Sequence, residues 1–230
     1  MLRQRILTAL LWGLAFLAAT WFGDPWYALL FAAAAVLGAL EFYRMVAHSR
    51  GQPLTYFGLV WTLLFVLTPH IENPHAVPLL VTSAVVFPLI WLVFRPQEGE
   101  AYTRWAWTVA GILYVGWLLS HLVALRGLEN GRDWVFLALL TTFVSDTGAF
   151  FVGRALGKHR LIPLISPGKT WEGTIAGFLG AIAVSLGLAI LLDLPIDYGQ
   201  AALLGAIISV FAQLGDLVES LLKRNMGVKD

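Results

Sequence analysis

The sequence predicts an all-α polytopic integral membrane protein, a bundle of about eight transmembrane helices with its N-terminus in the cytoplasm. Its 230 residues are 59% hydrophobic and only 13% charged, and the mean hydropathy is +0.77. Soluble domains carry about 25% charged residues. The apolar residues gather in eight segments, most of them near the roughly 20 residues that cross a bilayer core. A chain of this composition needs lipid to cover its surface.

The segments are separated by polar, glycine or proline breaks. They are expected near residues 5–22, 26–46, 54–69, 76–94, 105–125, 134–152, 173–192 and 200–221. The first follows a basic start, as in a signal peptide, but its apolar run is long and no small-x-small cleavage site precedes Gly23, so we interpret it as a membrane helix. The third is short, and Pro69 is expected to end it or kink it.

Positive charge supports this helix number and orientation, because cytoplasmic loops concentrate Lys and Arg. With the N-terminus inside, only Arg126 and Arg132 of the 15 basic residues lie on the outer side. The inner side collects Arg3, Arg5, Arg44, Arg50, Arg95, Arg104, Arg154, Lys158, Arg160, Lys169, Lys223, Arg224 and Lys229. We expect one membrane domain over residues 1–230, with N-terminal helices in 1–133 and the chemistry-bearing helices and cytoplasmic loop in 134–230.

Several classes of chemistry are excluded by composition and motif. The chain contains no cysteine, which rules out disulfides, thiolate metal sites and a cysteine nucleophile. No G-x-S-x-G or H-E-x-x-H pattern occurs, which argues against a serine hydrolase or a zinc protease. The five histidines show no metal-ligand spacing.

Two carboxylates inside apolar segments are functional candidates, because ionisable residues within a membrane are costly. Asp146 lies near the cytoplasmic end of the sixth segment, beside Ser145. Asp216 lies in the eighth, where Gln213, Asp216, Ser220 and Lys223 recur at spacings of three and four and so share one helix face. Both carboxylates are expected at the leaflet that carries the basic, glycine-spaced loop after Asp146.

These residues leave two interpretations open. Mg²⁺ is commonly held by one or two carboxylates plus substrate phosphates, and nearby Lys and Arg would bind further phosphate oxygens, so a nucleoside triphosphate site is plausible. Alternatively, Asp146 and Asp216 are polar packing groups or ion ligands of a cation- or proton-coupled transporter. A non-catalytic structural membrane protein is a third possibility.

The Gly-Lys-Thr at Gly168 to Thr170 invites comparison with a phosphate-binding P-loop. That pattern requires a glycine five positions before Gly168, where this chain has Pro163, and no soluble strand precedes it. The P-loop interpretation therefore fails. The loop can still bind phosphate through Lys169 and the amides that open the next helix, or it is a solvated loop that only follows the positive-inside rule.

Three stretches together resemble the bacterial phosphatidate cytidylyltransferases, also called CDP-diacylglycerol synthases. They are SDTGAFFVGR at 145–154 followed by Gly157 and Lys158, SPGKTWEG at 166–173, and QLGDLVESLLKR at 213–224. The family resemblance at the motif level covers about the last ninety residues, and the multi-helix layout agrees along the whole chain. It implies a membrane enzyme that joins CTP and phosphatidate into CDP-diacylglycerol and releases pyrophosphate.

The resemblance also implies roles for individual residues. Asp216 is expected to be a ligand of Mg²⁺, with Asp146 as a second acidic ligand and a second cation left open. The catalytic group implied comprises Asp146, Lys169, Asp216, Lys223 and Arg224. Substrate binding is assigned to Ser145, Arg154, Lys158, Ser166, Thr170, Glu172 and Ser220.

One departure concerns the end of the chain. The family pattern continues past Lys229-Asp230 with a His-Gly-Gly segment, an Asp-Arg-x-Asp element and a last helix, so the sequence resembles a version that lacks part of the acidic cluster and is expected to be inactive in that form. The expected partners are CTP, phosphatidate and the bilayer of the inner (cytoplasmic) membrane, with a homodimer left open and no nucleic acid.

Overall fold

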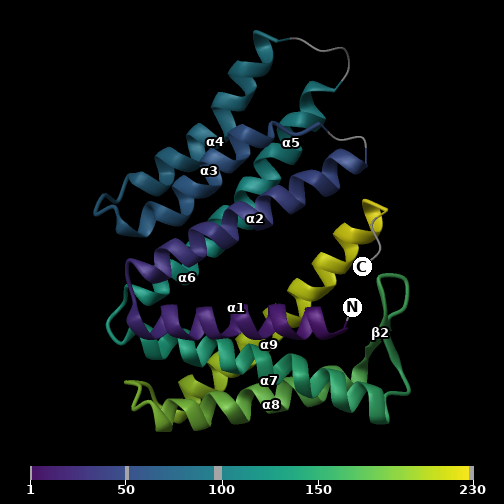
Figure 1. The fold of residues 1–230 in the computed structure, drawn as a ribbon. Helices are drawn as coiled ribbons and strands as arrows, with labels where there is room; N and C mark the ends of the chain where they lie inside the picture. Colours follow the sequence, from purple (N-terminus) through teal and green to yellow (C-terminus); the bar gives the residue numbers. More distant parts are fainter. Residues whose placement is uncertain (1, 50–51, 96–99, 228–230) are drawn as a thin grey trace. The chain divides into compact units, whose positions relative to one another are not determined.

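The structure is a computed structural model that describes residues 2–49, 52–95 and 100–227. It is built almost entirely of helices (Figure 1), which confirms the predicted all-α class. Six helices within the described residues are long and apolar enough to cross a membrane. Arg50, Lys229 and Asp230, and the side chains of Arg3 and Arg5, lie outside what is described. The cytoplasmic location of the N-terminus stays a prediction.

Two compact units make up the chain, Met1–Arg132 and Asp133–Asp230. The helices of the first unit are α1 (Leu2–Phe22), α2 (Trp26–His48), α3 (Thr55–Leu67) with a 3₁₀ turn (Thr68–His70), α4 (Ala76–Val93), α5 (Ala101–Gly111), a π-helical stretch (Ile112–Trp117) and α6 (Leu118–Arg126). The second unit contains α7 (Gly131–Leu156, which begins at the boundary), β1 (Arg160–Ile162), β2 (Ser166–Thr170), α8 (Trp171–Leu191) and α9 (Tyr198–Asn225).

Each of the eight predicted segments corresponds to helical structure. The 3₁₀ turn at Pro69 ends the third helix, as expected from a residue that cannot donate a backbone hydrogen bond. The helix expected over 105–125 is instead interrupted by a π-helical stretch. There Gly116 lies so close to α3 that a Cβ at this position would come within 2.8 Å of the Thr62 Cα, so the wider turn accompanies close helix contact.

The first unit is held by a buried tyrosine between three helices. The Tyr43 hydroxyl of α2 donates to the Thr108 carbonyl of α5 at 2.9 Å, and the Thr108 hydroxyl accepts the Leu54 amide at 2.8 Å. Gly58 of α3 and Gly111 of α5 both pack directly on the tyrosine ring. An aromatic side chain that satisfies its hydroxyl in this way can be buried without an unpaired polar group.

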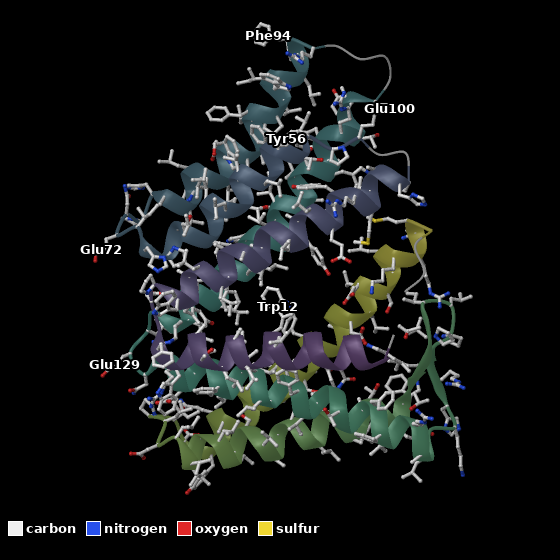
Figure 2. The ribbon with its side chains drawn as sticks, viewed as in Figure 1. Trp12, Tyr56, Glu72, Phe94, Glu100 and Glu129 are labelled. Carbon is white, nitrogen blue, oxygen red and sulfur yellow. The ribbon has the colours of Figure 1, made fainter. Side chains whose placement is uncertain are left out.

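Acidic and large apolar side chains are both exposed on the first unit. Glu72, Glu100 and Glu129 lie in connections at helix ends (Figure 2), where carboxylates are exposed. Large apolar side chains such as Tyr56 and Phe94 are exposed as well, at 88% and 80%. Such exposure is expected of residues that face lipid or its interface.

Small residues on α8 allow the helices of the second unit to pack closely. Every fourth residue of α8 is small and buried, namely Gly173, Gly177, Ala181, Ser185 and Ala189. Gly177 contacts the Ser145 carbonyl of α7, and Gly205 of α9 lies against α8 so that a Cβ there would come within 2.8 Å of the Ile182 Cα. Small-xxx-small spacing brings backbones together where no hydrophobic effect drives helices to associate.

We expect Gly177→Val to destabilise the second unit by about 2 kcal/mol or more, because the added side chain meets the α7 backbone. Gly187→Val, on the same helix, is a matched control because no atom lies within 4 Å of its Cβ position. Thermal unfolding in detergent measures both. Equal midpoints for the two variants would contradict the close α7–α8 packing.

Candidate functional site

A polar pocket of about 690 Å³ lies within the second unit. It is formed by the C-terminal part of α7, the β1–β2 hairpin, the start of α8 and the middle of α9. The lining residues are Asp146, Ala149, Phe150, Gly153, Arg154, Gly157, Arg160, Ser166, Gly168, Lys169, Thr170, Thr174, Gln213 and Asp216. Residues that are far apart in the sequence, including both candidate carboxylates, therefore share one cavity.

An ion pair joins the hairpin to α9 across this pocket. The Lys169 Nζ lies 2.6 Å from the Asp216 carboxylate, and it also donates to the Gln213 carbonyl at 3.1 Å. The side chain of Lys169 is 21% exposed and that of Asp216 is 55% exposed. The ammonium is thus held in place by two partners while the carboxylate keeps a solvent-facing side on which a ligand can bind.

Asp146 contributes the second carboxylate from α7, in agreement with the sequence-based expectation that it and Asp216 lie close together. Among the residues described, no group of three or more His, Cys, Asp or Glu side chains forms a metal cage. Two carboxylates in an open pocket instead match the usual way of holding Mg²⁺, in which substrate phosphates and water complete the coordination.

The basic segment between α7 and α8 is a β-hairpin where we expected a loop. Strand β1 pairs antiparallel with β2, with Arg160 opposite Thr170 and Ile162 opposite Ser166. A three-residue turn that starts at Pro163 joins the strands, and proline favours such turns. The strand pairing fixes the backbone around Lys169, so the lysine extends from an ordered element.

Thr170 connects the hairpin to α8 and is almost fully buried, at 3% exposure. Its hydroxyl caps the helix by accepting the Gly173 amide at 3.2 Å. Gly157 lies so close that a Cβ there would come within 2.6 Å of the threonine side chain. This junction places the N-terminus of α8, which favours anions, at the edge of the pocket.

A second contact ties the hairpin to α8. Glu172 accepts the His159 amide at 3.2 Å and the His159 ring Nδ1 at 2.7 Å, and the His159 carbonyl accepts the Trp171 amide at 2.9 Å. Glu172 is not among the pocket-lining residues. Its contribution in this structure is to hold the start of the hairpin.

A buried polar chain leads from the helix interior to the pocket. Ser145 of α7 bonds to Ser209 of α9 at 2.7 Å, and the Gln213 amide nitrogen donates to Ser209 and to the Thr174 carbonyl at 2.9 and 3.2 Å. Gln213 in turn provides the carbonyl that accepts from Lys169. Ser145, expected at the substrate, thus lies in the helix packing behind the pocket.

The remaining candidates lie away from the described lining. Lys158 is exposed on the hairpin side, and Ser220, Lys223 and Arg224 lie farther along α9. The Lys223 ammonium contacts Glu219 at 2.9 Å, one helical turn away. The substrate-binding roles implied for Lys158 and Ser220 and the catalytic roles implied for Lys223 and Arg224 stay predictions.

Gln213 and Arg160 line the pocket although neither was singled out as a site residue. Gln213 was detectable, because it shares the helix face of Asp216 at a spacing of three. Arg160 was one of several loop cations, and only the strand pairing opposite Thr170 places it at the pocket.

The family model described as "Cytidylyltransferase family" matches residues 3–230, nearly the whole chain. The chain belongs to the cytidylyltransferase family. The match extends over both units, so family membership does not rest on the C-terminal motifs alone.

Individual relatives agree with this membership. The chain is 31% identical over 237 residues to the phosphatidate cytidylyltransferase of Bacillus subtilis (strain 168), covering 100% of this chain and 87% of the relative. It is 32% identical over 231 residues to the protein of the same name from Brucella suis biovar 1, covering 100% and 82%. A shorter match to the Staphylococcus epidermidis protein of that name is 40% identical over 125 residues, 54% of this chain and 47% of the relative.

The hairpin forms part of the pocket lining, which gives a testable role for the His159–Glu172 contact. We expect Glu172→Gln to lower kcat/KM about tenfold or less, because it weakens the hydrogen bonds from His159 that hold the start of the hairpin but removes no pocket group. Steady-state kinetics measures the change in kcat/KM, and limited proteolysis measures whether the hairpin has loosened. A complete loss of turnover with an unchanged cleavage pattern would show that Glu172 contacts substrate.

Proposed function

We propose that the chain is a phosphatidate cytidylyltransferase, which transfers the cytidylyl group of CTP to phosphatidate to form CDP-diacylglycerol and pyrophosphate. The observation that carries the proposal is the Lys169–Asp216 pair beside Asp146 in one pocket, in a chain of the cytidylyltransferase family. The relatives named above support phosphatidate as the acceptor.

The reaction explains why the pocket needs positive charge. A phosphate oxygen of phosphatidate attacks the α-phosphorus of CTP, a new phosphorus–oxygen bond forms, and the bond to the β-phosphate breaks. Both reactants are anions that repel each other. Cationic groups that bind their oxygens lower this repulsion and stabilise the departing pyrophosphate.

Three basic side chains of the pocket suit that task. Lys169 is already oriented by Asp216 and Gln213, and Arg154 and Arg160 line the same cavity. Guanidinium groups bind phosphates in a bidentate manner, whereas lysine acts as a point charge. Because the attacking oxygen is already an anion, no general base is required.

Mg²⁺ is the proposed cofactor. Asp216 and Asp146 would hold it, and their oxygen donors and open setting fit a cation that shares its coordination with phosphates. When bound, such an ion supplies further charge neutralisation on the phosphate oxygens. The Lys169–Asp216 contact keeps both charges compensated before substrate arrives.

The proposed position of the pocket at the cytoplasmic side of the membrane rests on the apolar helices and the basic hairpin. The chain is a multi-pass membrane protein, and the basic hairpin is proposed to face the cytoplasm, where CTP is available. Exposed apolar side chains on α7, such as Phe150 and Phe151 at 59% and 64%, would let phosphatidate reach the pocket sideways from the inner leaflet.

Turnover of the full-length protein in lipid vesicles tests the proposal. With CTP, phosphatidate and Mg²⁺ we expect equal amounts of CDP-diacylglycerol and pyrophosphate, and no product when phosphatidate is replaced by phosphatidylcholine. Ion flux across the vesicle wall without consumption of CTP would support the transporter alternative instead and overturn the proposal.

A further inference from the structure

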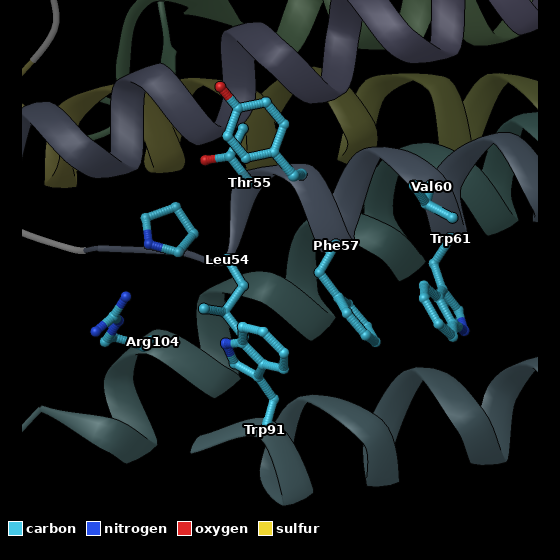
Figure 3. Close-up of a pocket in the computed structure, with 9 residues that line it drawn as sticks. Leu54, Thr55, Phe57, Val60, Trp61, Trp91 and Arg104 are labelled. Atoms are coloured by element: carbon cyan, nitrogen blue, oxygen red, sulfur yellow. The ribbon is translucent and has the colours of Figure 1, made fainter. Parts of the chain in front are cut away.

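A second cavity, of about 520 Å³, lies entirely within the first unit. It is formed by the residues before and along α3, the end of α4 and the start of α5 (Figure 3). Its volume falls within the range of about 300–1,000 Å³ that is typical of small-molecule pockets. None of the described lining residues is acidic, so it differs in chemistry from the pocket at Asp216.

Fixed aromatic rings form the wall of this cavity. Phe57 and Trp61 extend from α3 in the same direction (Figure 3), and their rings stack at 3.9 Å with an interplanar angle of 10°. The Trp61 indole is anchored by a hydrogen bond from Nε1 to the Ser83 hydroxyl at 2.9 Å. Trp91 extends from α4 toward Leu54 and completes an apolar surface.

One arginine lines this cavity, and a second contacts Trp91 in its wall. Arg104 lines the cavity beside Leu54 (Figure 3), and its Nε donates to the Gln52 carbonyl at 2.9 Å, which orients the guanidinium. The Arg95 guanidinium lies 4.9 Å from the centre of the Trp91 ring. Arg95 follows α4 and Arg104 lies in the first turn of α5, at helix ends that the charge distribution predicts to be cytoplasmic.

We propose that this cavity binds a phospholipid with an anionic headgroup. The acyl chain would lie against Phe57, Trp61 and Trp91, and the headgroup phosphate would bind Arg104 and Arg95. Among the described lining residues, an apolar wall with a cation at one edge matches an amphipathic anion. The site is additional to the proposed reaction and does not depend on it.

Native mass spectrometry of the full chain in detergent tests the proposal with dioleoylphosphatidylglycerol and dioleoylphosphatidylcholine as probes. We expect the wild type to retain the anionic lipid preferentially. Arg104→Gln should lower the affinity for it about tenfold, because a charged hydrogen bond to phosphate is lost. Arg132→Gln is the matched control, because this arginine also lies over an indole, that of Trp21 at 4.8 Å, but does not line the cavity.

A second variant tests the cavity independently of charge. Val60 lines the cavity and is 52% exposed, so Val60→Trp can fold while its larger side chain fills the space for the acyl chain. We expect it to lose the anionic lipid with Arg104 intact, and Asp216→Asn to retain it.

Three results would overturn the proposal. The first is equal retention of both lipids by the wild type, and the second is equal affinities of Arg104→Gln and Arg132→Gln for the anionic lipid. The third is displacement of the lipid by millimolar inorganic phosphate alone, which would identify a free anion as the ligand.

Discussion

Asp216→Asn is expected to abolish CTP-dependent formation of CDP-diacylglycerol, lowering kcat by about 10³-fold. The substitution keeps the size of the side chain but removes the charge that pairs with Lys169 at 2.6 Å and that we propose binds Mg²⁺. Loss of a metal's charge stabilisation costs several kcal/mol in the transition state, and each 1.36 kcal/mol is about tenfold in rate. Turnover in vesicles with radiolabelled CTP measures the effect.

Glu219→Gln is the matched control for this variant. Glu219 lies on the same helix, one turn beyond Asp216, and pairs with Lys223 outside the described pocket lining. We expect it to insert and to turn over within about twofold of the wild type, as surface ion pairs contribute little. Near wild-type turnover by Asp216→Asn would remove this residue from the mechanism.

Lys169→Met is expected to lower kcat/KM for CTP by about 10²-fold, with an increase in KM as well as a decrease in kcat. Its ammonium is held at the pocket by Asp216 and Gln213, and a charged donor to a phosphate group contributes about 1.5–3 kcal/mol. Methionine keeps much of the apolar stem, so the change reports mainly on charge. Initial rates over a range of CTP concentrations separate the two constants.

Lys158→Met provides the comparison for that variant. Lys158 belongs to the same basic segment but is exposed and lies outside the described lining. If binding depended only on the net positive charge of the segment, both variants would lose the same affinity for CTP. A clearly larger loss for Lys169→Met is the result that the pocket geometry requires.

The helices were predictable because hydropathy and charge act locally. All eight apolar segments are helical, and Pro69 ends one of them as expected. The hairpin at Arg160 to Thr170 was not predictable, because its strands are short, contain proline and glycine, and are stabilised by contacts with α8. The π-helical stretch against Thr62 likewise depends on tertiary packing.

The candidate site was predictable in its charged residues and not in their partners. The spacing on α9 and the cost of charge in a membrane indicated Asp216 and Asp146, and the structure places both at one pocket. Sequence could not show that Lys169, among several loop cations, is the one paired to Asp216. It also could not show that Ser145 packs against Ser209 behind the pocket.

We propose that the carboxylates of Asp146 and Asp216 form one divalent-metal site that operates with CTP. Electron paramagnetic resonance of Mn²⁺, used in place of Mg²⁺, tests it by measuring protein-bound metal in the presence of CTP, independently of turnover. We expect tight binding by the wild type and by Glu219→Gln, and binding weakened about tenfold or more in both Asp146→Asn and Asp216→Asn. Unchanged Mn²⁺ affinity in both aspartate variants would contradict it.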